Sequence, residues 1–460
     1  MRNKALLALL LFVLLLSPVL PVHAQAEGPV YVVQAGDTLS SIAQRFGTTL
    51  DALIAANAIA DPSLLQPGDT LVIPGFEMIS GVLTTREVEF GETLDTLSIA
   101  YGVERDSLMR LNRIIHPQRL YIGQAIIYPA SEEPVNDKVV YLVQPYSTRL
   151  EIAAQAGANP WALESLGANA SAEWLVPGQR VAAAGPSDLN LALTVPIQGV
   201  DVSPERAIQG RTVRVMLPVQ SPLEIDGRLG EWELSFHAHG ESWVALQGVH
   251  AMTEPGLYDL QLSIKDPLSG EVLFAVTQPM RITSGDYGFD PILFVPEETI
   301  DPMKTEPEDA MLASLVATAT EDKLWDDTFL YPSPYTDAFP SVFGSMRNYN
   351  NAGYSSYHTG LDFYGATGTP ITAPADGVVV FAGPLDVRGK VTVLDHGWGV
   401  YTGYYHQSEI LVSEGDQVAA GDEIGLVGAT GRVTGPHLHF QVWVGGVPVD
   451  PLEWLTNTFP

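Results

Sequence analysis

The chain has 460 residues, a length that predicts roughly three or more domains at about 100–200 residues each. It contains no cysteine, which excludes a lipoprotein anchor, disulfides and thiolate metal ligands. Its formal net charge is -31, from 54 acidic and 23 basic residues. This balance argues against nucleic acid as a partner, because phosphate binding relies on lysine and arginine. Because the chain has no cysteine, a metal site would use histidine, aspartate or glutamate.

The first residues follow the three-part pattern of a secretory signal. Arg2 and Lys4 precede the apolar run 5–16, and Val22 and Ala24 are placed for cleavage after Ala24. An uncleaved membrane anchor is the alternative, but the apolar run is shorter than the ~20 residues that span a bilayer. We expect a signal peptide over residues 1–24, a secreted or cell-envelope protein, and no transmembrane segment in the mature chain.

A repeated pattern follows the signal. The stretch "YVVQAGDTLSSIAQRF" begins at Tyr31, "REVEFGETLDTLSIAY" begins at Arg86, and the fainter "YLVQPYSTRLEIAAQAG" begins at Tyr141. Each copy predicts a short strand, a capped helix, a second helix and a returning strand. The predicted modules are residues 30–75, residues 86–130 and a degenerate third copy, residues 139–186.

Residues 189–284 alternate between apolar and polar side chains. In "LYDLQLSIKD", Leu260, Leu262 and Ile264 fall on one face of a strand, and Asp259 and Gln261 fall on the other. We expect an antiparallel β-sandwich that serves as a spacer or as a binding module of unassigned ligand.

The rest of the chain falls into two regions that differ in composition and in predicted secondary structure. Residues 285–335 are acidic and rich in proline, which predicts a linker, with a helix in "EDAMLASLVATATEDKLWDD". Residues 336–460 consist of strand patterns and glycine turns, which predict a compact β domain. The whole chain is thus expected to be multidomain and mainly β.

Two histidines in "GPHLHF" are separated by one residue. As a strand, this stretch puts His437 and His439 on one face, with Cβ atoms about 6.5–7 Å apart. A metal ligand beside an acid-base group fits this spacing, and so do two ligands that converge. The stretch "FHAHG" repeats the spacing at His237 and His239 without a carboxylate–histidine motif, so we expect an exposed strand face there.

Other potential ligands surround this pair in the last domain. "YHTGLD" supplies His358 and Asp362, and "YYH" supplies His406. One aspartate and two histidines suit zinc at about 2.0–2.2 Å and leave a fourth position for water, as a catalytic site requires.

These motifs carry two family resemblances. The first two repeats, with "GDTL" and "GETL" turns, resemble LysM modules, whereas the third has "PYSTR" at that place. The LysM resemblance implies binding of peptidoglycan glycan that contains N-acetylglucosamine. "FGSMR", "HTGLD", "GTPITAPADGVVVFAG", "YYH" and "GPHLHF", over residues 343–452, resemble the lysostaphin-type (LytM) zinc metalloendopeptidases, which cleave peptides of bacterial peptidoglycan.

The second resemblance implies a role for each histidine of the last domain. His358, Asp362 and His439 correspond to the ligands of Zn2+, and His406 and His437 correspond to the catalytic histidines. We expect a structural role for His396 and a place in the wall or core for Tyr404 and Tyr405.

Two functions are consistent with these features. The leading hypothesis is a secreted zinc metalloendopeptidase that hydrolyses peptide bonds in peptidoglycan and is held on the wall by its LysM repeats. The alternative is a non-catalytic envelope-binding protein that activates or recruits another cell-wall hydrolase. Peptidoglycan is the expected partner, as substrate and as the glycan bound by the LysM repeats, and no nucleic-acid partner is expected.

Overall fold

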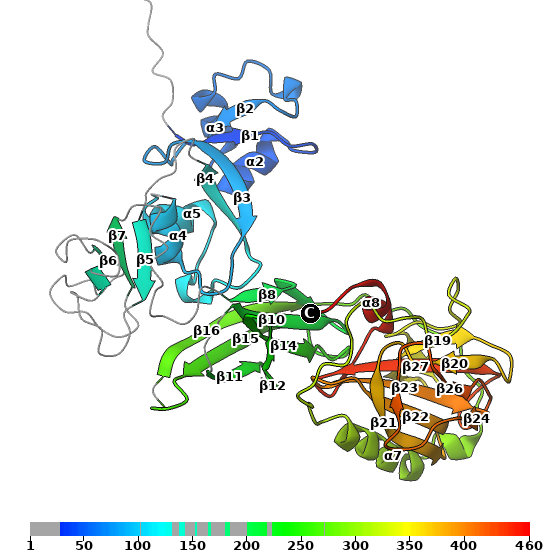
Figure 1. The fold of residues 1–460 in the computed structure, drawn as a ribbon. Coiled ribbons are helices and arrows are strands. Elements are labelled where there is room, and N and C mark those ends of the chain that lie inside the picture. Colours follow the sequence, from blue (N-terminus) through cyan, green and yellow to red (C-terminus); the bar gives the residue numbers. More distant parts are fainter. Residues whose placement is uncertain are drawn as a thin grey trace, which may run out of the picture. The chain divides into compact units, whose positions relative to one another are not determined.

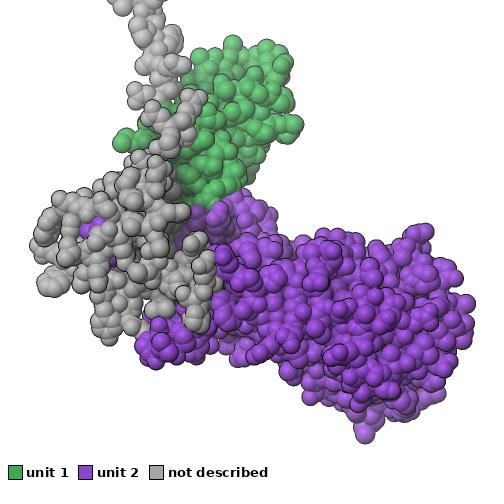
Figure 2. All heavy atoms as spheres, in the orientation of Figure 1, with its two compact units in different colours: residues 1–86, 94–115, 126–136 green, residues 87–93, 116–125, 137–460 purple. Residues whose placement is uncertain are grey.

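The computed structural model divides the chain into two compact units, shown in Figure 2. The structure describes residues 28–130, except Gly102. It also describes residues 138–142, 152–153, 164–166, 180–184, 200–218, 223–270 and 272–460. The expected signal peptide, residues 1–24, lies outside this part of the chain. Within it, no helix combines the length and the apolar character that crossing a membrane requires.

The first two repeats form strand, helix, helix and strand, as expected (Figure 1). Helix α2 begins at a capping box, in which Thr38 and Ser41 each bond the other's backbone N–H. It ends at Gly47, whose φ of 67° is the left-handed conformation that glycine adopts at little cost. The elements are β1 (Val30–Val32), α2 (Leu39–Phe46), α3 (Leu50–Ala56), η1 (Pro62–Leu64), β2 (Thr70–Val72), β3 (Val82–Glu87), α4 (Leu94–Ala100), α5 (Arg105–Leu111), η2 (Pro117–Arg119) and β4 (Ala125–Ala130).

One asparagine in each of the first two repeats joins the second helix of that repeat to the returning strand. The Asn57 side chain donates to the carbonyls of Leu53 and Val72 and accepts from the Val72 N–H. Asn112 makes the same set of bonds in the second repeat. The two repeats share one sheet in the order β2-β1-β3-β4, in which β1 and β3 are parallel.

Of the third repeat, the described part contains only three strands and two further residues. Strands β5 (Lys138–Leu142), β7 (Arg180–Ala184) and β6 (Glu164–Leu166) pair side by side in that order. The remainder of the predicted module 139–186 falls outside the described residues.

The middle domain is built from two sheets that face each other across one apolar core. Leu260, Leu262 and Ile264 of β15 are buried in it, on the face that the alternating pattern predicts. The sheet orders are β13-β14-β10-β8 and β12-β11-β15-β16-β9. Their strands are β8 (Asp201–Ser203), β9 (Arg206–Ile208), β10 (Thr212–Pro218), β11 (Glu224–Leu229), β12 (Trp232–Leu234), β13 (His237–His239), β14 (Ser242–Gly248), β15 (Gly256–Lys265) and β16 (Val272–Thr283).

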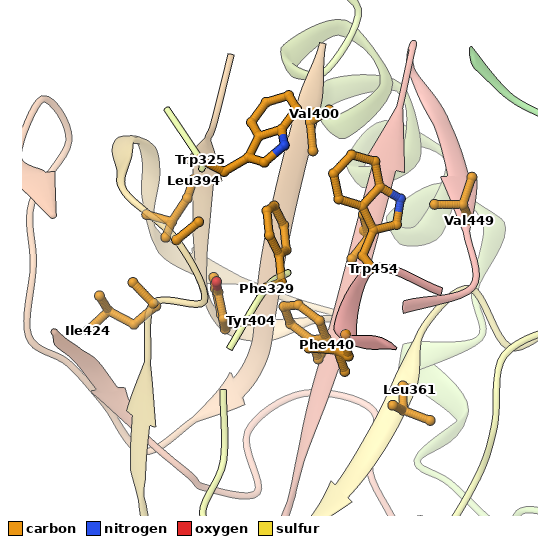
Figure 3. Close-up of a cluster of buried hydrophobic side chains, with 14 of the residues drawn as sticks. Trp325, Phe329, Leu361, Leu394, Val400, Tyr404, Ile424, Phe440, Val449 and Trp454 are labelled. Atoms are coloured by element: carbon orange, nitrogen blue, oxygen red, sulfur yellow. The ribbon is translucent and has the colours of Figure 1, made fainter. Parts of the chain in front are cut away.

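The segment 285–335 packs against the last domain. Its helix, α7 (Pro302–Leu315), follows the short η4 (Glu297–Thr299) and begins where Asp301 caps the first turn ahead of Pro302. The helix therefore starts before the expected stretch 308–327 and ends inside it. Beyond the helix, Trp325 and Phe329 are buried in the core of the C-terminal domain, close to Trp454 (Figure 3).

The last domain is a β structure with a short helix at its end. Its main sheet runs β19-β27-β23-β22-β21-β25, with β28 paired to β27, and a smaller sheet runs β20-β26-β24. The elements are β17 (Met346–Asn348), β18 (Tyr354–Tyr357), β19 (Leu361–Tyr364), β20 (Pro370–Thr372), β21 (Gly377–Leu385), β22 (Gly389–Asp395), β23 (Val400–Gln407), β24 (Glu409–Ile410), β25 (Gln417–Val418), β26 (Glu423–Leu426), β27 (His437–Val444), β28 (Val447–Val449) and α8 (Pro451–Thr456).

The sandwich and the last domain share buried contacts. Val244 and Leu246 of β14 belong to the same apolar cluster as Trp454 of α8. The Thr212 N–H donates to the Glu453 carboxylate at 2.9 Å, and the Trp454 indole donates to the Thr212 hydroxyl at 3.1 Å. Polar groups that are buried here are thus satisfied across the junction.

His396 is fully buried, with both ring nitrogens engaged by the protein. Nδ1 lies 2.6 Å from the Asp376 carbonyl oxygen, and Nε2 lies 2.8 Å from the Thr402 hydroxyl. A carbonyl only accepts, so the proton lies on Nδ1 and Nε2 accepts from Thr402. The ring acts as a buried crosslink, consistent with the structural role expected for it.

Acid should weaken the last domain through His396. Burial lowers the pKa of this imidazole from 6.5 to about 4, so the unfolded state takes up the proton first. The stability that the neutral ring provides is intact above the unfolded pKa and is lost as the pH falls toward 4. About 2 kcal/mol should be lost by about pH 5. The urea midpoint, followed by tryptophan fluorescence at about pH 7 and about pH 5, measures this loss.

The His396→Gln variant is the control, because its side chain hydrogen-bonds without titrating. It should lose less stability than the wild type over the same pH interval. Equal losses in the two proteins would show that His396 is not the group responsible.

Candidate metal centre

The main sheet and one preceding loop bring the five candidate residues together. His358 directly follows β18, Asp362 lies in β19, and His406 lies near the end of β23. His437 and His439 share one face of β27. The antiparallel register sets Asp362 opposite His439, so these two side chains are neighbours across the strands.

His358, Asp362 and His439 converge on one point and form a group able to hold a metal ion. His358 Nε2 lies 3.0 Å from Asp362 Oδ1 and 2.8 Å from His439 Nδ1. His439 Nδ1 lies 3.0 Å from the same Asp362 oxygen. All three residues are buried.

The outer contacts of the two imidazoles determine which nitrogens face inward without a proton. His358 Nδ1 lies 3.0 Å from the Val342 carbonyl oxygen, so that nitrogen carries the proton and Nε2 presents a lone pair. His439 Nε2 faces the Gln441 side-chain oxygen at 3.5 Å, which favours a lone pair on Nδ1. Two imidazole lone pairs and a carboxylate oxygen therefore crowd one point. Such crowding is unfavourable unless a cation lies among them.

The surroundings of Asp362 favour its ionised form. Burial opposes the charge, but the contacts with His358 and His439 hold the pKa of the Asp362 carboxyl well below its usual value. Its second oxygen, Oδ2, forms an ion pair at 3.1 Å with Arg347, which also pairs with Asp290. Burial lowers the pKa of His439 to about 4, so this imidazole is neutral, as a metal ligand must be.

His437 lies beside this group but not within it. Its Nε2 is 3.7 Å from Asp362 Oδ1. Its Nδ1 lies 2.9 Å from the Gly435 carbonyl oxygen, so Nδ1 carries the proton and Nε2 faces the group as an acceptor.

An irregularity in β23 brings His406 to the same side as its neighbour Tyr405. His406 has a φ of 64°, a left-handed conformation that few residues other than glycine adopt. In a regular strand, two consecutive side chains would point to opposite faces. Here the Tyr405 ring stacks on His439 with centroids 4.9 Å apart, and the His406 ring contacts His437 with centroids 5.0 Å apart.

The environment of His406 keeps its ring neutral. Burial, together with nearby His437 and His439, holds the pKa of His406 well below its ordinary value. Its Nδ1 lies 2.8 Å from the Thr430 carbonyl oxygen. The proton therefore lies on Nδ1, and Nε2 is left as an acceptor.

A cavity of about 630 Å³ opens beside these side chains. His358, His406 and His439 line it together with Arg388 and Arg432. Its volume falls in the range of ligand sites in proteins.

Three contributors to the site were not identified from the sequence. Arg347 lies in the "FGSMR" motif, and only its positive charge could have indicated a role beside a carboxylate. The Val342 and Thr430 carbonyls, which orient His358 and His406, carry no side-chain signal at all. Tyr404 lies in the apolar core and Tyr405 lines the cavity, in line with the wall and core places expected for them.

The pair in "FHAHG" lies away from the site and packs against an aromatic ring. His237 stacks on Trp398 with ring centroids 5.3 Å apart, and His239 meets the edge of the same ring at 5.6 Å. His237 is partly buried and His239 is exposed, so the expectation of an exposed strand face holds for His239.

Comparison with known proteins places family matches on these regions. Residues 356–451 match the model of peptidase family M23, and residues 31–74 and 87–129 match the LysM domain. The DD-carboxypeptidase/endopeptidase Mpg of Neisseria meningitidis serogroup B is 45% identical over 96 residues, which cover 21% of this chain and 22% of that protein. The peptidoglycan DD-endopeptidase ShyA of Vibrio cholerae serotype O1 is 46% identical over 96 residues, with the same coverage of 21% and 22%.

The chain thus spans about a fifth of the length of these relatives, since 22% of each is covered. A crystal structure from Pseudomonas aeruginosa assigned to peptidase M23 is 26% identical, covers 54% of this chain and 95% of its own, and has a TM-score of 0.43. Both family matches coincide with the modules described above. The chain thus carries two regions that match the LysM domain, followed by a C-terminal region that matches peptidase family M23.

Proposed function

We propose that the protein is a zinc metalloendopeptidase that hydrolyses peptide bonds in bacterial peptidoglycan. The observation that carries this proposal is the convergence of His358, Asp362 and His439 beside a cavity of about 630 Å³. The peptidase family of the domain and the names of its relatives, which are peptidoglycan DD-endopeptidases among others, support the same substrate class.

His358, Asp362 and His439 would hold the metal. Two neutral imidazoles and one carboxylate suit zinc, and this set leaves a coordination position for a substrate or a water molecule. When bound, the ion would supply Lewis acidity toward a peptide carbonyl and toward water. The oxygen of Asp362 that lies away from the group stays paired with Arg347, which fixes the direction of the carboxylate.

His437 is the residue we propose as the general base. Its Nε2 faces the ligand group with a free lone pair, while the Gly435 carbonyl holds the proton on Nδ1. A neutral imidazole in this position can accept a proton from an attacking water molecule and deliver it to the departing amine.

His406 would assist in proton transfer. Its proton is held by the Thr430 carbonyl, so the neutral ring offers an acceptor and no donor toward the cavity. Donation to an oxyanion would require a second proton on the ring before the reaction begins, and burial opposes that resting charge. We therefore favour proton transfer over oxyanion binding for this residue.

The two LysM domains would bind the glycan strands of peptidoglycan, which contain N-acetylglucosamine, and hold the peptidase near its substrate. This arrangement requires an extracytoplasmic location, which the LysM domains and the cell-wall relatives support. Secretion through the predicted signal peptide would deliver the chain there.

Variants of two neighbouring histidines should separate catalysis from metal binding. His437→Ala should retain about one zinc per chain and lose roughly 10²- to 10⁴-fold in turnover, because only the proton carrier is removed. His439→Ala should lose both zinc and activity. Release of new amino termini from purified peptidoglycan measures activity, and elemental analysis measures zinc.

His239→Ala is the matched control, because it breaks an identical histidine pair outside the site and should change neither quantity. Full activity of His437→Ala would contradict the proposed base. Wild-type protein that lacks zinc and releases no termini would favour the non-catalytic envelope-binding alternative.

Removal of the Arg347 side chain should weaken zinc binding without removing a ligand. We expect Arg347→Leu to lower zinc affinity about 10- to 100-fold, the usual effect of losing a partner that orients a ligand. Competition with a chromophoric chelator measures this affinity. Arg214→Leu, which removes an arginine paired with Asp201 in the sandwich, is the control and should leave zinc affinity unchanged. Equal affinities in the Arg347 variant and the wild type would contradict the orienting role.

Soluble oligomers of N-acetylglucosamine should compete with peptidoglycan for the LysM domains. In a sedimentation assay with insoluble peptidoglycan, we expect these oligomers to release the zinc-free His439→Ala chain from the pellet, while oligomers of glucose should not. The zinc-free variant avoids digestion of the matrix. Retention in the pellet at saturating oligomer would argue that the LysM domains do not account for wall binding.

A further inference from the structure

Arginine side chains line the cavity beside the candidate metal centre, and they differ in whether a carboxylate neutralises them. Arg347 pairs with Asp290 and Asp362, both at 3.1 Å. Arg388 pairs with Glu308 at 3.0 Å and also contacts Asp309. These cations are therefore compensated by the protein.

Arg432 has no such partner in the part of the chain that the structure describes. Among the described residues, no carboxylate lies within the 4.0 Å ion-pair distance of its guanidinium. The guanidinium has five N–H donors, and to the residues that the structure describes it makes one hydrogen bond, with the Thr299 carbonyl at 3.3 Å. Its carbon lies over the ring of Tyr349, 4.6 Å from the centroid. A cation that is partly buried in this way lacks the anion that would normally accompany it.

The backbone holds Arg432 firmly in place at the cavity. Its N–H donates to the Val387 carbonyl at 2.7 Å. Two residues earlier in the same loop, the Thr430 carbonyl accepts from His406. The loop therefore positions one proposed proton carrier and the unpaired guanidinium together. A group bound to Arg432 would lie on the His406 side of the cavity.

We propose that Arg432 determines specificity by binding a carboxylate of the substrate peptide. This inference rests on the proposed peptidase function. Arginine binds a carboxylate through two parallel hydrogen bonds, which fix the direction of the bound group as well as its charge. The chain has a net charge of -31, so an anionic substrate is repelled overall and needs a local cation to be retained.

The carboxylate can be of two kinds, a C-terminal carboxylate or one on a side chain. A peptide dimer cut from purified peptidoglycan carries both, and each can be converted separately to an amide. The test compares kcat/KM for three substrates: the parent dimer, the C-terminal amide and the side-chain amide. The proteins are the full-length wild type, Arg432→Gln and Arg432→Lys.

For the wild type, we expect one amidated substrate to be cleaved about 10- to 100-fold less efficiently than the parent, which is the effect of losing one hydrogen bond between charged groups. The substrate affected identifies the carboxylate that is bound. Arg432→Gln should bring that ratio close to one, mainly by lowering kcat/KM for the parent. Arg432→Lys, which keeps the charge but cannot bind in the two-point manner, should give an intermediate ratio.

Arg388→Lys is the matched control, because that arginine lines the same cavity but is already paired, and the substrate ratio should stay at the wild-type value. Thermal unfolding of each variant checks that it is folded, and Arg432→Lys preserves the test if Arg432→Gln does not fold. Cleavage of all three substrates at equal rates by the wild type would overturn this inference alone. Absence of cleavage of any substrate by zinc-loaded wild type would overturn the proposed function and this inference with it.

Discussion

The arrangement of the site depends on one buried negative charge, the carboxylate of Asp362. A carboxylate out of contact with water is tolerated only when cations or donors surround it. Here one oxygen points with His358 and His439 to the place that a metal cation would take, and the other pairs with the guanidinium of Arg347. Each partner comes from a different segment, and all must be in place before the charge is compensated. Folding of these segments and formation of the candidate metal centre are therefore one process.

The protons of the site are arranged by backbone carbonyls. Val342, Gly435 and Thr430 each accept from the Nδ1 of a histidine, so in all three rings the Nε2 lone pair faces inward. Side chains could vary at these three positions without changing the tautomers. The chemistry proposed here thus depends on the paths of two loops, one with Val342 and one with Thr430 and Gly435, as much as on the histidines themselves.

The sequence predicted the folding units more completely than the site. The alternation along β15 and the capping pattern at Thr38 are local sequence signals, and the structure contains both the strand and the capped helix that they predict. The five candidate site residues were identified from sequence motifs, because the residue types that such a site requires can be read directly from the sequence. The placement of His406 beside Tyr405 on one side of β23 was not predictable, since its left-handed backbone coincides with an irregularity in the pairing of β23 with β22 and no residue type signals it. The ion pairs of Arg347 join residues that are up to 57 positions apart, from Asp290 to Arg347. Sequence periodicity reports local secondary structure and does not predict contacts over that distance.

Trp325 and Phe329 belong to the core of the C-terminal domain although they precede residue 336, where the sequence suggested that the domain begins. The family match, which begins at residue 356, leaves them out as well. A gene segment cut at either boundary would encode a domain that lacks two buried core side chains, Trp325 and Phe329, whose rings contact Trp454. For this protein, the C-terminal folding unit, with its complete core, is longer than the segment that matches the family.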